Sequence, residues 1–198
     1  MDWKILSPLL MLLQGDCSPG SDEATTRSEK ASIGTVVDGR ISSISASSYH
    51  TPVGHIRSPK TPPWEHVFEP RMLMDGSLQT CWQEGNDDTR GDGEWVIVYF
   101  KEATDLTEIR LANGCQDYWS DAGWGDLYSK NPRVKKLKIE SNKGDTEFWS
   151  LSDTGGWQTL SVDMKDVSNL TLTIVGDVYR GTEWKDASIS EISFRGKK

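Results

Sequence analysis

The sequence predicts a single all-β domain built as a β-sandwich. Short apolar stretches with two-residue alternation recur from about residue 41 onward, separated by clusters of glycine, asparagine, aspartate and proline. No helical period is sustained, and no internal repeat or glycine-rich phosphate loop is present, so a nucleotide-binding fold is disfavoured. The length of 198 residues suits one domain with a core and a tail.

The predicted strands follow in chain order. Residues 95–100 are apolar on both faces, as in a central strand. Residues 108–111 and 136–140 alternate apolar with charged side chains, which is typical of half-buried strands. Further strands are expected at 157–162 and at 170–174. Strands at this spacing build a sandwich.

The closing segment 187–194 carries one carboxylate among apolar residues. Its apolar pattern changes face after Ile189, so that a regular strand places Ile192 and Phe194 on the opposite side. A β-bulge at Ser190–Glu191 restores one buried face and re-aims the carboxylate. An unpaired buried charge is costly, and a hard cation held by oxygens is one solution.

The first 36 residues are expected to precede the domain. Residues 1–16 contain an apolar run of signal-peptide length and predict a signal peptide or lipoprotein leader, with a helix packed on the domain as the alternative. Residues 17–36 are short and polar and predict a flexible spacer, which leaves 37–198 as the folded domain. Cys17 stands where a leader is acylated, but Asp16 replaces the expected small residue, so lipidation stays open. We expect a secreted protein or an outer-surface lipoprotein.

Composition narrows the partners. The net charge of -8 repels phosphates and acidic membranes, so we expect no nucleic-acid partner and a membrane only through an N-terminal lipid anchor. Nine tryptophans supply rings that combine a large apolar face with a hydrogen-bond donor, as sugar-binding surfaces do. Trp64 and Trp82 are expected to pack in the core or its shell. Cys81 and Cys115 either form a disulfide or remain buried thiols.

The long segment 113–131 is the predicted binding surface. It is too long for a tight hairpin, and long loops on rigid sandwiches usually carry function. Aromatic rings stack on the apolar face of a sugar, while polar side chains bind its hydroxyls. The alternative is that some rings, Trp124 and Tyr128 first, merely cap the end of the sandwich. The candidate ligand-binding residues here are Asp117, Tyr118, Trp119, Asp121, Trp124, Tyr128, Asn131 and Arg133.

The order of several motifs resembles the discoidin, or coagulation-factor C-domain-like, superfamily. The resemblance implies a galactose-binding-like jelly-roll sandwich and covers nearly everything from about residue 43. It is closest to the carbohydrate-binding translocation domain of bacterial NAD-glycohydrolase toxins. The segments that carry it are MLMDGSLQTCW (72–82), GEWVIVYF (93–100), IRLANG (109–114), NPRVKKLKIE (131–140), GWQTL (156–160) and VYRGTEWKDASISEISF (178–194).

The resemblance implies a structural Ca²⁺, because in this superfamily calcium often sits where an Asp-Gly loop meets the Glu of the final strand. Calcium takes about six to eight oxygens from flexible loops. The alternative is a plain turn at Asp75–Gly76 and an exposed or arginine-paired Glu191. The implied ligands are the carboxylates of Asp75 and Glu191, the hydroxyl and carbonyl of Thr80, and the backbone carbonyls of Met72, Ser77 and Cys81.

The resemblance also implies that other segments converge with the long loop. Their candidate ligand-binding residues are Tyr49, His50, Tyr179, Arg180 and Trp184. The sequence therefore predicts a non-catalytic carbohydrate-binding module of an exported, surface-tethered or secreted bacterial protein, with glycan as its partner.

Two other functions compete with glycan binding. The first is an adhesion module of the same fold that binds a host or cell-surface protein or lipid headgroups. The second is a glycan-active enzyme, which is disfavoured because the three histidines lack zinc spacing and no nucleophile elbow is present.

Overall fold

The computed structural model describes residues 34–51, 68–86, 90–119 and 124–197, with Trp119 described by its backbone alone. These residues confirm the all-β prediction. Among them no helix is long and apolar enough to cross a membrane. The strands are β1 (Thr35–Val36), β2 (Ile41–Ala46), β3 (Trp82–Gln83), β4 (Trp95–Asn113), β5 (Tyr118–Trp119), β6 (Gly125–Asp126), β7 (Lys136–Ser141), β8 (Thr146–Ser150), β9 (Trp157–Ile174) and β10 (Ser188–Lys197). The helical turns are η1 (Asp38–Arg40), η2 (Pro70–Met74) and α1 (Leu127–Lys130).

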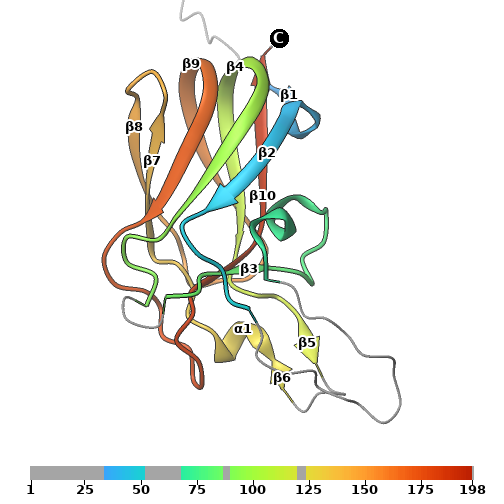
Figure 1. Cartoon of the computed structure of the whole chain (residues 1–198), viewed down its shortest axis with the longest axis vertical. Helices are drawn as coiled ribbons and strands as arrows, with labels where there is room; N and C mark the ends of the chain where they lie inside the picture. The colour runs from blue at the N-terminus through green and yellow to red at the C-terminus, as the bar shows by residue number, and fades with distance from the viewer. Residues whose placement is uncertain (1–33, 52–67, 87–89, 120–123, 198) are drawn as a thin grey trace, which may run out of the picture. The chain divides into compact units, whose positions relative to one another are not determined.

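Eight strands form one antiparallel sheet in the order β1-β10-β4-β9-β7-β8, with β2 added to β4 and β3 added to β10. Strands β5 and β6 form a separate pair. Strand β4 merges the predicted strands at 95–100 and 108–111, and β9 merges those at 157–162 and 170–174. Figure 1 shows β4 (green) and β9 (orange) side by side, each turning back near its middle.

The turn in β4 and β9 makes the sheet a sandwich. Strand β2 pairs with one edge of β4 over 96–100, and β10 takes the same edge over 105–112. The β4–β9 register shifts between these two stretches of β4, and there the sheet turns back so that its two halves face each other. Phe100 of the first half meets Phe194 of β10 edge-on, with ring centroids 5.6 Å apart. The predicted β-sandwich is therefore confirmed, with one main core between its layers.

The first half of β4 is covered on one face only. Val96, Val98 and Phe100 are buried, whereas Tyr99 is 39% exposed and Ile97 is half-buried. Because residues 95–100 are apolar on both faces, the sequence predicted a central strand covered on both sides. Strand β4 is central in its hydrogen bonding, but an antiparallel sheet can leave its outer face to water.

The predicted β-bulge at Ser190–Glu191 stays a prediction, because the pairing of β10 with β4 begins at Glu191 and does not include Ser190. Pairing with β4 runs without a shift from Glu191 to Arg195, and the irregularity falls between Arg195 and Gly196. The apolar pattern can change face because β10 is covered on both sides: η2 packs against it, and Ile189 is as deeply buried as Ile192.

The predicted spacer ends too late. Thr35 and Val36 were expected in the spacer 17–36, but they form β1 and pair with Arg195 and Gly196. An unpaired strand end presents free backbone groups, and β1 pairs with that end of β10. The expected leader, Cys17 and Trp64 lie outside the described residues.

A second, smaller core lies apart from the main one. Cys81 and Cys115 form a disulfide with their Cα atoms 5.3 Å apart, which resolves the alternative that the sequence left open. Phe68 and Leu127 complete this core, and Trp124 and Trp184 pack against it. Trp82 is fully buried in the main core, as expected.

Candidate functional site

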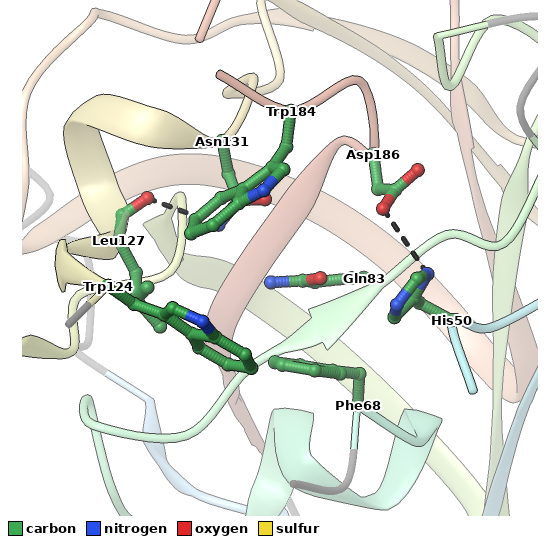
Figure 2. Close-up of a pocket in the computed structure, with 8 residues that line it drawn as sticks. All are labelled: His50, Phe68, Gln83, Trp124, Leu127, Asn131, Trp184 and Asp186. Carbon is green, nitrogen blue, oxygen red and sulfur yellow. Dashed lines mark hydrogen bonds and ion pairs between the residues drawn. The ribbon is translucent and has the colours of Figure 1, made fainter. Parts of the chain in front are cut away.

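A hollow of about 210 Å³ adjoins the smaller core and is the candidate binding site (Figure 2). We call it the aromatic pocket. Three rings supply apolar walls: Trp124 and Trp184 pack edge-to-face with centroids 5.9 Å apart, and Phe68 adds the third. Figure 2 shows the Gln83 side chain between the two tryptophans and His50. The lining residues are His50, Phe68, Gln83, Trp124, Leu127, Asn131, Trp184 and Asp186.

The short helix α1 positions one side of the pocket. The Asp126 side chain caps its start by accepting a hydrogen bond from Tyr128 N at 3.1 Å. Asn131 ends it, and both its backbone N and its Nδ2 donate to the Leu127 carbonyl, at 3.0 and 3.2 Å. Two features of the sequence mark α1: Asp126 stands directly before it, and Asn131-Pro132, which cannot continue a helix, stands directly after it.

Trp184 is held against the end of α1. Its backbone N donates to the Lys130 carbonyl at 3.1 Å, and Lys130 Nζ lies 5.5 Å from the centroid of its ring. A glycine is required nearby, because a Cβ at Gly181 would stand 2.1 Å from the Lys130 carbonyl oxygen. The ring is thus positioned before any ligand arrives.

Polar groups face these apolar walls. Gln83 and Asn131 are both buried, and each side-chain amide can donate and accept hydrogen bonds. His50 Nδ1 lies 3.3 Å from Asp186 Oδ2, and the histidine ring meets Phe68 edge-on. Backbone contact fixes His50 as well, since its N donates to the Gln83 carbonyl at 2.9 Å. Rings beside a few convergent polar groups suit a small polyhydroxylated ligand.

The buried carboxylate of Glu84 holds backbone next to two residues that line the pocket, Gln83 and Asp186. Glu84 is fully buried, and its oxygens accept hydrogen bonds from Asn86 N at 2.7 Å and Ala187 N at 3.1 Å. Burial raises the pKa of Glu84 to about 7; these backbone hydrogen bonds oppose the rise, and the carboxylates of Asp186 and Glu94 add to it. Because Ala187 follows Asp186, this contact also helps to place the Asp186 side chain.

Four residues predicted from the sequence line the pocket: His50, Trp124, Asn131 and Trp184. Phe68, Gln83, Leu127 and Asp186 were missed. Asp186 carries a signal that could have found it, since it lies two residues before the final strand, β10. Phe68 and Gln83 carry none, because only the fold brings them to the pocket.

The other predicted loop residues lie elsewhere. Tyr118 in β5 is 69% exposed and Tyr49 is 47% exposed, both outside the lining. Asp117 shapes the loop, because its Oδ1 accepts from Tyr118 N and its carbonyl accepts from Leu127 N. The backbone of Trp119 lies in β5, and Asp121 lies outside the described residues.

Arg133 and its neighbours are engaged inside the protein. The buried guanidinium donates to both oxygens of Asp153 at 2.9 and 2.8 Å, which lowers the pKa of Asp153. It also donates to the Arg180 carbonyl at 3.0 Å and lies over the Tyr128 ring. Tyr179 donates its hydroxyl to the Leu151 carbonyl at 2.9 Å. None of these four predicted residues, Tyr128, Arg133, Tyr179 and Arg180, lines the aromatic pocket.

Glu191 lies beside the Asp75–Gly76 loop, as the implied calcium site requires. Glu191 Oε2 is buried without a hydrogen-bond partner among the described residues, while Oε1 accepts from Gly76 N at 3.4 Å. Burial raises the pKa of Glu191 to about 7, with the Asp75 and Asp38 carboxylates adding to the shift. An orphaned carboxylate oxygen near a second carboxylate is an arrangement that a hard cation satisfies.

The remaining implied ligands surround Asp75. Thr80 Oγ1 lies within hydrogen-bond distance of both Asp75 oxygens and of the Ser77 carbonyl, and its single proton is donated to one of them. Met72 is buried in η2, and Cys81 offers only its carbonyl because its sulfur is in the disulfide. In the described part of the chain no three His, Cys, Asp or Glu side chains gather as a metal site. Hydroxyl and carbonyl oxygens would therefore complete the set.

Solved structures place this fold among the galactose-binding-like sandwiches. A CBM32 domain from Clostridium perfringens in complex with GalNAc-beta-1,3-galactose superposes with a TM-score of 0.56 at 12% identity, covering 82% of this chain and 100% of that one. The family 32 CBM from C. perfringens NanJ, in complex with galactose, gives 0.52 at 16%, covering 82% and 98%. The F5/8 type C domain of a Bacteroides fragilis protein gives 0.55 at 12%, covering 84% and 98%. At these identities the likeness shows the fold alone.

The chain belongs to the family described as the NAD glycohydrolase translocation F5/8 type C domain, whose model matches residues 57–195. The resemblance seen in the sequence is thereby confirmed. A comparison with curated proteins found no significant match.

Proposed function

We propose that this protein is a non-catalytic carbohydrate-binding module whose aromatic pocket binds a sugar of a glycan. The observation that carries the proposal is the set of Trp124, Trp184 and Phe68 rings facing the amides of Gln83 and Asn131. Indole faces pack on the C–H face of a pyranose, and side-chain amides can both donate hydrogen bonds to its hydroxyls and accept them. Two solved structures of the same fold carry galactose-type sugars, which supports the choice of ligand class.

The pocket suits one sugar ring. Its volume of about 210 Å³ lies below the ~300–1,000 Å³ of sites that enclose drug-sized ligands. The His50–Asp186 pair at one wall is suited to orienting a hydrogen bond to a single hydroxyl. We therefore infer recognition of one sugar unit rather than of a long chain.

A glycan array with the full chain, followed by calorimetric titration of the best ligand, tests the proposal. Trp124→Ala and Trp184→Ala should each weaken binding by about tenfold or more, equal to ~1.4 kcal/mol. Trp157→Ala is the matched control, because this ring on β9 is 38% exposed and lies outside the pocket.

Two results would contradict glycan binding at this pocket. Equal weakening by Trp157→Ala would place the ligand elsewhere. No bound glycan with a well-folded protein would favour the adhesion alternative, for which Tyr49 and Tyr118 are the exposed aromatic side chains to substitute first.

We also propose that the protein is exported. Disulfides persist mainly in oxidising compartments, and Cys81–Cys115 is one. Attachment through a lipid on Cys17 stays part of this proposal and rests on the sequence alone. Fractionation of expressing cells checks it, and a protein confined to the cytosolic fraction would contradict export.

We further propose calcium as a structural ion held by Asp75, Thr80 and Glu191, completed by backbone carbonyls. Thermal unfolding in excess calcium and in chelator tests this, because calcium at about 100 times its dissociation constant adds ~2.7 kcal/mol to stability. Glu191→Gln should remove the response. Glu84→Gln is the matched control, since Glu84 is also buried but lies outside the implied ligand set. An unchanged melting temperature in chelator would contradict the proposal.

A further inference from the structure

A second hollow, of about 490 Å³, is lined by residues at the start of β7, at the end of β8 and in the loop after β9. Figure 1 shows β7 and β8 side by side. It shares no lining residue with the aromatic pocket. The lining side chains that matter here are Lys135, Lys136, Phe148, Ser150, Asp177 and Tyr179. We call this hollow the lysine groove.

Strand alternation explains why an aromatic ring faces solvent in the lysine groove. Trp149 points into the core and is 6% exposed, so its neighbour Phe148 points outward and is 56% exposed. The register pairs Phe148 with Lys138 and Ser150 with Lys136, which places these side chains on one face of the sheet. The ring therefore stands among lysines rather than among apolar neighbours.

A lysine ammonium group lies beside each aromatic ring of the lysine groove. Lys136 Nζ lies 4.9 Å from the Phe148 ring centroid, and Lys135 Nζ lies 5.7 Å from that of Tyr179. Tyr179 is fixed by the hydrogen bond from its hydroxyl to the Leu151 carbonyl. Both lysines are thus held beside flat rings that line one hollow.

The charge of the lysine groove differs from that of the chain. Within the described residues, no ion pair joins Lys135 or Lys136 to a carboxylate, although the chain carries a net charge of -8. Asp177 supplies one negative charge to the lining, which leaves a small positive excess. A ligand with a single negative charge per unit is complementary to this set.

We propose that the lysine groove is a second binding site, for an acidic saccharide whose pyranose ring carries a carboxylate. The apolar face of the pyranose packs on Phe148, and its carboxylate lies near the Lys135 and Lys136 ammonium groups. Ser150 and Asp177 provide partners for its hydroxyls. The volume is within the ~300–1,000 Å³ range of ligand sites, so more than one sugar ring fits. This site is separate from the aromatic pocket and goes beyond the function proposed for it.

Calorimetric titration of the full chain tests the proposal with four acidic probes: a hyaluronan hexasaccharide, an alginate hexasaccharide, a trigalacturonate and sialyllactose. At least one should bind, and its carboxyl-reduced form should bind about tenfold more weakly. Phe148→Ala and Lys136→Ala should each weaken binding about fivefold, because each removes one of the two contacts. Lys143→Ala is the matched control, since this lysine sits in the β7–β8 turn and pairs with Asp166.

The site is distinguished from the aromatic pocket by Trp184→Ala, which should leave binding of the acidic probe unchanged. Loss of binding in Trp184→Ala but not in Phe148→Ala would overturn the proposal, as would equal weakening by Lys143→Ala. Binding of none of the four probes would also overturn it. A hexaglutamate peptide that binds as tightly as the saccharide would show recognition of charge alone and reject a sugar site.

Discussion

Arg133 ties the aromatic pocket to the sandwich. Its Nη1 donates to the Asn131 carbonyl at 3.0 Å, so it holds the backbone at a residue that lines the pocket. Its neighbour Val134 donates its backbone N to Asn113 Oδ1 at 3.0 Å, which anchors the same segment to the end of β4. A side chain predicted to bind sugar hydroxyls thus supports the pocket from within.

We expect Arg133→Met to lower the free energy of unfolding by about 2–3 kcal/mol, because it leaves the Asn131 and Arg180 carbonyls without their donor. Asp153→Asn should cost about 1 kcal/mol, since its side chain is 38% exposed and water can replace part of the contact. Urea denaturation measures both. Arg110→Met, at a guanidinium over the exposed Trp157 ring, is the control and should change stability by about 0.5 kcal/mol or less. If Arg133→Met lowers the free energy of unfolding no more than Arg110→Met does, Arg133 does not support the pocket from within the protein.

At the scale of elements, the disulfide joins the two segments that frame the pocket. Cys81 immediately precedes β3, which carries Gln83, and Cys115 follows the end of β4. The bridge lies in the smaller core against which Trp124 and Trp184 pack. Its removal should therefore affect the pocket as well as overall stability.

We expect the Cys81→Ser/Cys115→Ser double variant to be about 2–4 kcal/mol less stable, because the bridge closes a loop between residues 34 positions apart. Urea denaturation measures the loss. Tryptophan fluorescence in the folded state should shift toward that of a more solvated ring. An unchanged fluorescence spectrum with reduced stability would show that the pocket does not depend on the disulfide.

At the scale of the whole molecule, buried carboxylates make stability depend on pH. The pKa of Glu84 rises from 4.5 to about 7 in the folded protein. Between these values the folded state binds more protons than the unfolded state, so the free energy of unfolding falls as pH rises. The contribution of Glu84 is fully present below pH ~4.5 and is lost as pH passes about 7.

We expect Glu84→Gln to flatten this pH dependence. The difference in unfolding free energy between wild type and Glu84→Gln should change between pH 5 and pH 8, with wild type losing more stability over that interval. Urea denaturation at both pH values, in the same calcium concentration, measures it. A difference that stays constant with pH would show that Glu84 titrates at its ordinary value.

The element predictions succeeded where the signal was local. Alternation identified the apolar stretches of β4, β7 and β9, because each of these strands buries one face against the nearest layer. Strand β10 is buried on both faces and was identified by its run of apolar residues. The merging of 95–100 with 108–111 was missed, since the polar stretch 101–107 between them reads as a turn. Strand β8 was also missed, because adjacent Phe148 and Trp149 break the alternation that marks a half-buried strand.

What the sequence determined by itself is the all-β class and the family, because two-residue alternation, turn residues and motif order are properties of neighbouring residues. Only the tertiary structure decided which side chains meet. His50, Phe68, Trp124 and Trp184 come from separate segments, and Arg133 turns inward although its residue type suits a ligand contact. The pairing of Cys81 with Cys115 was likewise decided only by the tertiary structure. Such juxtapositions depend on how β4 and β9 turn and on which loops meet at one end of the sandwich, and no local pattern encodes that.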